Sequence, residues 1–246
     1  MRDTPPPYRT VVFDCDSTLS AIEGIDELGA ARRAEIEALT NRAMSGELRL
    51  EDVYALRLAL VRPSKARVER LGQEYVERAL PEARALVNAL HALEKRVVIV
   101  SGGVATAVRV LAAHLGVVDE RVHAVELRFD AAGEYAGFDA RSPLARSGGK
   151  VEVLRELGGE RDARPLALVG DGITDLEAGE ADGGADRFIA YGGVARRTAV
   201  FERARVTCAT KSLAGLVPLL FSAAEIDTLS RRPEHAALLR ATHLTS

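Results

Sequence analysis

Short apolar runs, each bounded by polar or glycine-rich residues, recur along the chain. Continuous runs of this length are typical of strands that are buried on both faces of a parallel sheet. The pattern predicts strands at Thr10–Phe13, Arg96–Val100, Pro165–Val169 and Arg187–Ala190.

Between these runs, apolar residues recur with the 3.6-residue period of a helix. The pattern predicts helices at Pro81–Glu94, Ala105–Leu115 and Val151–Leu157. Because strands alternate with helices, we predict an α/β fold with a doubly wound parallel sheet. Val122–Phe129 and Tyr135–Phe138 are predicted to form a hairpin inserted in this pattern, joined through Ala131-Ala132-Gly133.

The segment from Ala21 to about Leu80 has helical periodicity and no strand pattern. We therefore predict a small helical cap domain (residues 21–80) inserted after the first strand of a catalytic core (residues 1–20 and 81–221). Pro63-Ser64 interrupts the cap once and is expected to begin a helix. Residues 222–246 form a charged tail, with a short helix expected around Glu234–Ala241.

Composition narrows the class of protein. The chain has 246 residues, 47% of them hydrophobic, and a net charge of −3. This balance predicts no surface for nucleic acid, and no apolar run approaches the length of a membrane span. Two cysteines and the lack of a signal-peptide pattern favour the cytoplasm. We expect a small-molecule partner and a monomer or homodimer.

Three of the predicted strands end in polar or glycine-rich clusters. In an open parallel sheet, ligands bind outside the carboxyl ends of the strands, so these clusters are expected to meet at one site. The clusters are Asp14-Cys15-Asp16-Ser17-Thr18, Ser101-Gly102-Gly103 and Gly170-Asp171-Gly172-Ile173-Thr174-Asp175.

The first and third clusters contribute four carboxylates, those of Asp14, Asp16, Asp171 and Asp175. Carboxylates that converge on one pocket repel one another unless a cation lies among them. Oxygen ligands favour Mg²⁺, which commonly takes one or two protein carboxylates together with water and substrate phosphate. A carboxylate is then left free to attack phosphorus and form an acyl-phosphate.

The other polar residues suit phosphoryl transfer, in which catalysis is mostly positioning and charge neutralisation. Ser101 can donate its hydroxyl, and the amides of Gly102 and Gly103 can approach a phosphate closely. Lys150, at the start of a predicted helix, can supply a fixed positive charge.

Taken in order, these clusters resemble the four motifs of the haloacid-dehalogenase-like superfamily, and within it those of the phosphoserine phosphatases. The likeness extends from about Thr10 to Leu220 and implies a Rossmann-like core with a helical cap. Supporting stretches are Glu23–Leu28, Arg42–Met44, Arg57–Leu60, Gly133–Asp139 and Ser147–Lys150.

The resemblance implies a catalytic role for each carboxylate. Asp14 would be the nucleophile, and Asp16 would protonate the departing seryl oxygen and then deprotonate the attacking water. Mg²⁺ would be held by the carboxylates of Asp14 and Asp171 and by the backbone carbonyl of Asp16. Asp175 would orient Lys150 or a metal-bound water.

The resemblance also implies a way of binding the substrate. Ser101 and Lys150, with Gly102 and Gly103, would hold the phosphoryl group, and Thr174 and Arg196 match positions near the phosphate and the cap.

O-phosphoserine carries an ammonium and a carboxylate beside its phosphate. Glu23 would meet the ammonium, Arg57 the carboxylate, and Met44 would line the pocket. The products would be serine and phosphate, as in the last step of serine biosynthesis.

Two alternatives stay open at this stage. The core could act on another small phosphomonoester, or the fold could serve as a binding protein without catalysis. One departure from the family pattern also bears on the substrate. Ser45-Gly46 stands where the family often has Gly-Gly, so the serine side chain could alter the fit.

Cys15 lies between the two aspartates of the first cluster. Alternation along an extended segment points its side chain to the opposite face, so we predict a buried packing role and not a thiol nucleophile.

Overall fold

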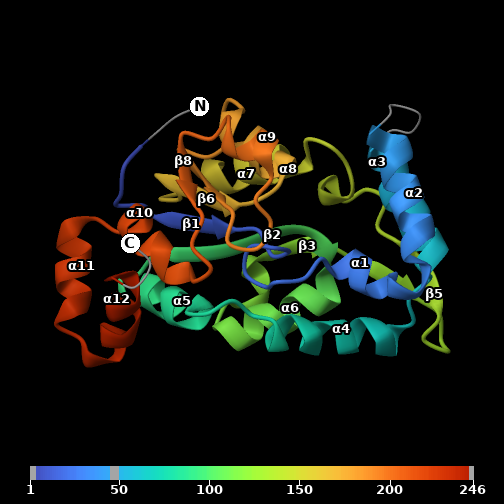
Figure 1. The fold of residues 1–246 in the computed structure, drawn as a ribbon, viewed down its shortest axis with the longest axis horizontal. Helices are drawn as coiled ribbons and strands as arrows, with labels where there is room; N and C mark the ends of the chain where they lie inside the picture. The colour runs from blue at the N-terminus through green and yellow to red at the C-terminus, as the bar shows by residue number, and fades with distance from the viewer. Residues whose placement is uncertain (1–3, 45–49, 244–246) are drawn as a thin grey trace.

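A computed structural model describes residues 4–44 and 50–243, apart from the side chains of residues 37, 40–44, 50, 51 and 243 (Figure 1). Its centre is a six-stranded sheet in the order β3-β2-β1-β6-β7-β8, in which every neighbouring pair is parallel. The predicted α/β fold is confirmed. The strands are β1 (Thr10–Phe13), β2 (Arg96–Val104), β3 (Val122–Val125), β6 (Leu166–Gly170), β7 (Arg187–Tyr191) and β8 (Val206–Cys208).

Successive residues of the central strands face two separate apolar layers. Val11 and Phe13 pack in one core cluster, whereas Val12 packs in the other, and all three are completely buried. One layer is formed by α4 (Lys65–Glu77), α5 (Ala83–Ala92) and α6 (Ala105–Leu115), and the other by α7 (Gly149–Gly159), α8 (Ile173–Glu180) and α9 (Thr198–Phe201) (Figure 1). Both faces are covered, which explains why the strands are continuously apolar.

The strand order reverses beside β1. From β1 the chain proceeds to β2 and β3 on one side, and β6 then pairs with the opposite edge of β1. Such a reversal leaves a crevice at the carboxyl ends of the two central strands. The residues that follow β1 and β6 are Asp14 and Asp171, and the topology therefore brings them together.

The segment predicted as a cap consists of helices joined by short connections in its described part. It contains α1 (Gly24–Leu28), α2 (Arg33–Met44), α3 (Leu50–Val61) and α4, with α1–α3 at one end of the molecule (Figure 1). Ser64 caps α4 by accepting a hydrogen bond from the Arg67 amide at 3.3 Å, as Pro63-Ser64 predicted. Helix α4 packs along α6 and thereby joins the layer that covers the sheet.

The predicted hairpin is only partly correct. Its first segment divides at Glu126: β3 joins the parallel sheet beside β2, and only β4 (Leu127–Phe129) pairs with β5 (Tyr135–Phe138). The apolar residues Val125, Leu127 and Phe129 alternate with polar ones across both parts, so the sequence gives no sign of the break. The hairpin contacts the helical segment, since the Lys65 amide donates to the Gly133 carbonyl at 2.8 Å.

The tail contains two helices, α11 (Ala223–Ser230) and α12 (Ala236–His243), of which only the second was predicted. Leu229 and Leu238 are buried in the core cluster that contains α5. Glu225 pairs at 2.5 Å with Lys95, whose ammonium is buried and also donates to the Tyr8 carbonyl at 2.7 Å. The tail is therefore packed against the core. Short helical turns complete the fold: η1 (Ala30–Arg32), η2 (Asp119–Arg121), η3 (Pro143–Ala145), η4 (Leu213–Leu216), α10 (Val217–Leu220) and η5 (Pro233–His235).

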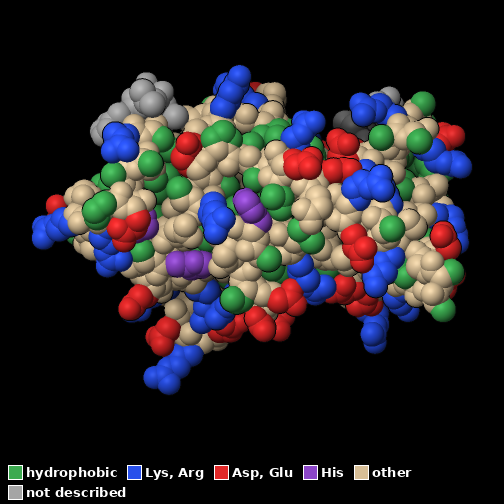
Figure 2. Space-filling view, turned by 90° about the horizontal axis from the view of Figure 1, so that it is seen from below, with side chains coloured by type: hydrophobic (Ala, Val, Ile, Leu, Met, Phe, Trp, Pro, Cys, Tyr) green, Lys and Arg blue, Asp and Glu red, His purple; other side chains and the backbone are tan. Residues whose placement is uncertain are grey.

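The face of the molecule seen in Figure 2 is mixed in charge. Figure 2 shows Lys and Arg side chains interspersed with Asp and Glu side chains over one face of the molecule. Within the described residues, no helix combines the length and apolar character needed to span a bilayer.

Candidate active site

Asp14 lies where β1 ends, at the crevice of the sheet. Its amide donates to the Val169 carbonyl of β6 at 2.9 Å, which continues the pairing of the two strands by one residue. Its Oδ1 accepts a hydrogen bond from the Cys15 amide at 2.7 Å. The Cys15 side chain is completely buried among core residues, as the alternation predicted.

Lys150 links two of the carboxylates. Its Nζ lies 2.9 Å from Oδ2 of Asp14 and 2.7 Å from Oδ1 of Asp175. Burial lowers the pKa of Lys150, but the two neighbouring carboxylates raise it by more, so the ammonium keeps its proton. A fixed positive charge therefore lies beside Asp14.

Asp175 is held through both of its carboxyl oxygens, since Oδ1 contacts Lys150. Its Oδ2 accepts a hydrogen bond from the Gly172 amide at 3.0 Å, at the start of α8. The carboxyl group lies directly over Gly170, where a Cβ would come within 2.3 Å of its carboxyl carbon. Only glycine at position 170 leaves room for this arrangement.

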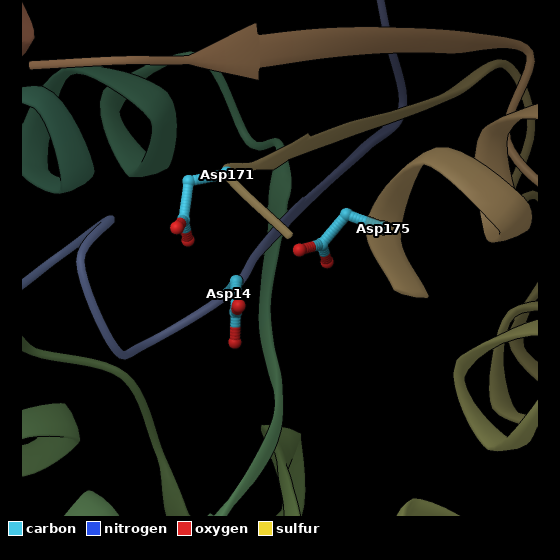
Figure 3. A group of neighbouring side chains, drawn as sticks. All are labelled: Asp14, Asp171 and Asp175. Atoms are coloured by element: carbon cyan, nitrogen blue, oxygen red, sulfur yellow. The ribbon is translucent and has the colours of Figure 1, made fainter. Parts of the chain in front are cut away.

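Three buried carboxylates can approach a common ion. Oxygen atoms of Asp14, Asp171 and Asp175 lie within 4.8 Å of one another, and Figure 3 shows the three side chains converging from separate elements. Burial and the nearby Asp14 raise the pKa of Asp171 to about 6. A cation among these groups would relieve their repulsion, so the donor set suits a hard divalent metal.

Asp16 lies beside this cluster. Its Oδ1 accepts hydrogen bonds from the Tyr75 hydroxyl and from the Gly24 amide, the latter at 3.1 Å. Burial, together with the charges of Glu23 and Asp14, raises the pKa of Asp16 to about 8. A carboxyl group with that pKa can hold a proton at neutral pH and release it.

Glu23 is held by residues from both sides of the crevice. Its Oε1 accepts from the Ser17 hydroxyl at 2.8 Å and from Nη2 of Arg197 at 2.9 Å. Ser17 has φ = 52°, which few residues other than glycine adopt, so the loop after β1 is tightly turned. Nε of Arg197 lies 2.8 Å from Oδ2 of Asp171.

Ser101, Gly102 and Gly103 form the end of β2. The Ser101 hydroxyl is buried and accepts from the Gly103 amide at 2.9 Å. A Cβ on Gly103 would lie 3.4 Å from Oδ2 of Asp16, so this segment is adjacent to that carboxylate.

These elements surround one cavity of about 220 Å³, large enough for a phosphate and a small organic group. Its described lining residues are Asp14, Asp16, Glu23, Gly102, Leu144, Arg146, Lys150, Asp171, Gly172, Thr174 and Arg197.

Comparison with known families decides the class of protein. Residues 11–180 match the family model described as haloacid dehalogenase-like hydrolase. This chain belongs to that family.

Relatives of this haloacid dehalogenase-like hydrolase share most of its length. It is 40% identical over 197 residues to a phosphoserine phosphatase of Mus musculus, covering 79% of this chain and 86% of that protein. It is 41% identical to a chloroplastic phosphoserine phosphatase of Arabidopsis thaliana, over 79% of this chain and 66% of that protein. A solved phosphoserine phosphohydrolase-like protein from Francisella tularensis has a TM-score of 0.70 and 25% identity, over 90% of this chain and 99% of that one.

The cavity of the hydrolase brings together most of the residues expected from its sequence. Asp14, Asp16, Glu23, Gly102, Lys150, Asp171 and Thr174 line it, and Ser101, Gly103 and Asp175 lie directly behind these residues. Met44 ends α2, but its side chain and residues Ser45-Gly46 lie outside the described part of the chain.

Two arginines are placed differently from the expectation. The guanidinium of Arg196 lies over the Phe201 ring at 5.1 Å, and its neighbour Arg197 is the one that reaches the cavity. Arg57 is not among the described lining residues. It pairs with Asp26 of α1, and its buried Nε has no hydrogen-bond partner among the residues that the structure describes.

The sequence patterns missed four residues of the site: Leu144, Arg146, Tyr75 and Arg197. Tyr75 occupies an ordinary apolar position in a helical pattern, and Arg146 and Arg197 lie in loops without periodicity. The adjacent pair Arg196-Arg197 was the one available signal, but a loop gives no rule for which of two neighbours faces the site.

Proposed function

We propose that this hydrolase cleaves O-phosphoserine to serine and phosphate through a phosphorylated Asp14. The observation that carries the proposal is the contact of Asp14 with Lys150 at 2.9 Å, beside Asp16 in a shared cavity. This arrangement provides a nucleophile, a fixed cation and a proton donor. The relatives that carry the name phosphoserine phosphatase support the choice of substrate.

In the first step, a carboxylate oxygen of Asp14 attacks phosphorus and the bond to the seryl oxygen breaks. Lys150 lies beside the developing negative charge, while Asp175 and the Gly172 amide keep the ammonium in place. Ser101, Gly102, Gly103 and Thr174 are proposed to hold the phosphoryl oxygens.

Asp16 is proposed to act as the general acid in the first step and as the general base in the second. Its raised pKa allows the carboxyl group to protonate the departing seryl oxygen. The resulting carboxylate then takes a proton from the water that cleaves the acyl-phosphate, which restores the starting state. Serine leaves after the first step and phosphate after the second.

A divalent cation is expected at the carboxylate cluster, and we propose Mg²⁺. The carboxylates of Asp14 and Asp171 and the backbone carbonyl of Asp16 would hold it. When bound, the ion would neutralise negative charge on the phosphoryl group and on the carboxylates around it.

Substrate choice is proposed to depend on groups around the mouth of the cavity. Glu23 lines the cavity and can accept the ammonium of the substrate. Arg57 and Met44 are retained as candidates for the carboxylate and for the pocket wall, and Arg196 as a residue of the surrounding loop. Because Nε of Arg57 has no partner within the described part of the chain, it can donate a hydrogen bond to the substrate.

The experiment that tests the proposal compares kcat/KM for phosphoserine with that for a panel of sugar, nucleotide and alkyl phosphates in the presence of Mg²⁺. We expect phosphoserine to be preferred by at least about 10-fold, which is roughly 1.4 kcal/mol of transition-state binding. If another ester is preferred over phosphoserine by the same factor, the proposed substrate is wrong but the proposed chemistry still holds. If the protein releases phosphate from none of these esters, the result would favour a binding protein without catalysis.

The division into core, cap and tail at residues 20, 80 and 221 is likewise a proposal, as is a cytoplasmic location. Two free cysteines, Cys15 and Cys208, support a reducing compartment.

A further inference from the structure

Tyr75, on α4, is buried in the core cluster that α4 shares with α5 and α6. Its side chain is completely inaccessible to solvent, and its backbone carbonyl accepts from the Ser20 hydroxyl at 3.0 Å. Gly24 adjoins its hydroxyl so closely that a Cβ there would lie 2.1 Å from the phenol oxygen. The ring therefore has one position available to it.

The Tyr75 hydroxyl donates to Asp16, and to one particular oxygen. Oδ1 of Asp16 accepts from both the phenol and the Gly24 amide. The other oxygen, Oδ2, lies near Gly103 of β2, in the segment proposed to hold phosphate, since a Cβ added there would be 3.4 Å from both Oδ2 and the Tyr75 hydroxyl. The two carboxyl oxygens of Asp16 thus have different surroundings.

We propose that Tyr75 is a positioning residue, which holds Oδ1 of Asp16 so that Oδ2 gives and takes the proton. The inference rests on the proposed function, because it requires Asp16 to be the general acid and base. A carboxyl group held by two donors on one oxygen cannot rotate without losing both hydrogen bonds, so the free oxygen stays directed at the reacting group.

Packing alone does not account for a tyrosine at this position. A phenylalanine would fill the same space without the free-energy cost of burying a hydroxyl, and a hydrogen bond to a partner offsets that cost. Here the partner is a carboxylate that lines the cavity.

The test compares two esters in Tyr75→Phe. Seryl oxygen must be protonated as it leaves, whereas p-nitrophenolate departs without a proton. In both cases kcat/KM reports only the steps up to loss of the leaving group. General acid catalysis contributes roughly 10²–10⁴-fold. We expect kcat/KM for phosphoserine to fall about 30-fold through kcat, with KM changed less than about 2-fold. For p-nitrophenyl phosphate it should fall less than about 3-fold.

Loss of folded protein would lower both values equally, so the ratio of the two remains informative if the variant is less stable. Tyr191→Phe is the matched control, since Tyr191 is also completely buried and its hydroxyl has no hydrogen-bond partner among the described residues. Its ratio should equal that of the wild type.

An unchanged ratio in Tyr75→Phe would overturn the inference, whether both esters slow equally or neither does. Asp16→Asn separates this result from failure of the proposed function, because it should lower the same ratio further. If the wild-type protein prefers another alkyl phosphate, only the substrate assignment is wrong. The Tyr75 test is then done with that ester in place of phosphoserine.

Discussion

Arg197 and Asp171 are joined by an ion pair at 2.8 Å between Nε and Oδ2. The same guanidinium reaches Glu23 at 2.9 Å, so it connects the residue after β6 with the residue before α1. Two carboxylates that would otherwise repel each other share one cation in this way. The cavity thereby gains a positive charge in addition to that of Lys150.

Replacing Arg197 with alanine should weaken binding of the anionic substrate. We expect KM for phosphoserine to rise about 10-fold or more, since a charge-assisted contact contributes roughly 1.5–3 kcal/mol. Arg196→Ala is the control, because that side chain lies over Phe201. Steady-state kinetics of both variants should show less than about a 2-fold change in the control, and a reversed order would assign the role to Arg196.

Asp14→Asn should abolish turnover, because an amide cannot attack phosphorus. We expect kcat to fall by at least about 10³-fold while phosphoserine still binds. Acid quenching after mixing with ³²P-labelled substrate should trap phosphoenzyme in the wild type and none in the variant. Labelled protein in Asp14→Asn would contradict the assignment of the nucleophile.

The neighbouring thiol provides the matched control for that variant. Cys15→Ala should retain kcat within about 3-fold, because the Cys15 side chain packs in the core and away from the cavity. The cost should be one of stability, about 1 kcal/mol for the small cavity left behind.

Removal of divalent metal should stop the reaction. We expect a chelator to lower activity at least about 100-fold and Mg²⁺ to restore it. Mg²⁺ should also raise Tm, because a ligand that binds only the folded state at 100 times its Kd stabilises it by about 2.7 kcal/mol.

Asp171→Asn should lose most of this rise in Tm. Asp130→Asn, in the exposed hairpin turn, should keep it. The same rise in both variants would place the ion elsewhere.

Gly170→Ala should damage both stability and activity. Its Cβ would lie 2.3 Å from the Asp175 carboxyl carbon, so the carboxyl group that holds Lys150 would have to move. We expect a loss of about 2–3 kcal/mol in the free energy of unfolding. Gly159→Ala, with nothing within 4 Å of the added Cβ, should be neutral or stabilising by up to about 1 kcal/mol. Urea unfolding of the two variants measures the difference.

Arg57→Ala should discriminate between substrates. If the guanidinium binds the carboxylate of phosphoserine, KM for phosphoserine should rise at least about 10-fold, and KM for phosphoethanolamine, which lacks that group, should change less than about 3-fold. Arg67→Ala is a suitable control, because Arg67 also reaches α1, through the Glu27 carbonyl at 3.1 Å. Equal increases in KM for both substrates would show that Arg57 does not bind the carboxylate.

Most of the core could be predicted because its strands are buried on both faces. Continuous apolar runs located β1, β2, β6 and β7, whereas β8 has three residues and is too short to stand out. The division between β3 and β4 was missed because it depends on which neighbour each half pairs with. Such a choice is made by tertiary packing and leaves no local pattern.

The site divides in a similar way. Residues fixed by a strand end, such as Asp14 and Asp171, could be placed from their sequence motifs because the topology brings strand ends together. Arg197 lies in a loop, and its position depends on the pairing with Asp171 and Glu23 across the crevice. Tyr75 could be assigned only to a helix, since its contact with Asp16 depends on how α4 packs against α6.

The pairing of Lys95 with Glu225 has a consequence for how the chain folds during synthesis. Domains form from the N-terminus as the ribosome adds residues. The Lys95 ammonium is buried beside β2, yet its carboxylate partner is made 130 residues later. Until Glu225 is available, closing the core around Lys95 would bury an unpaired charge, which is costly. The nascent core is therefore expected to stay incomplete, and open to chaperones, until the tail emerges.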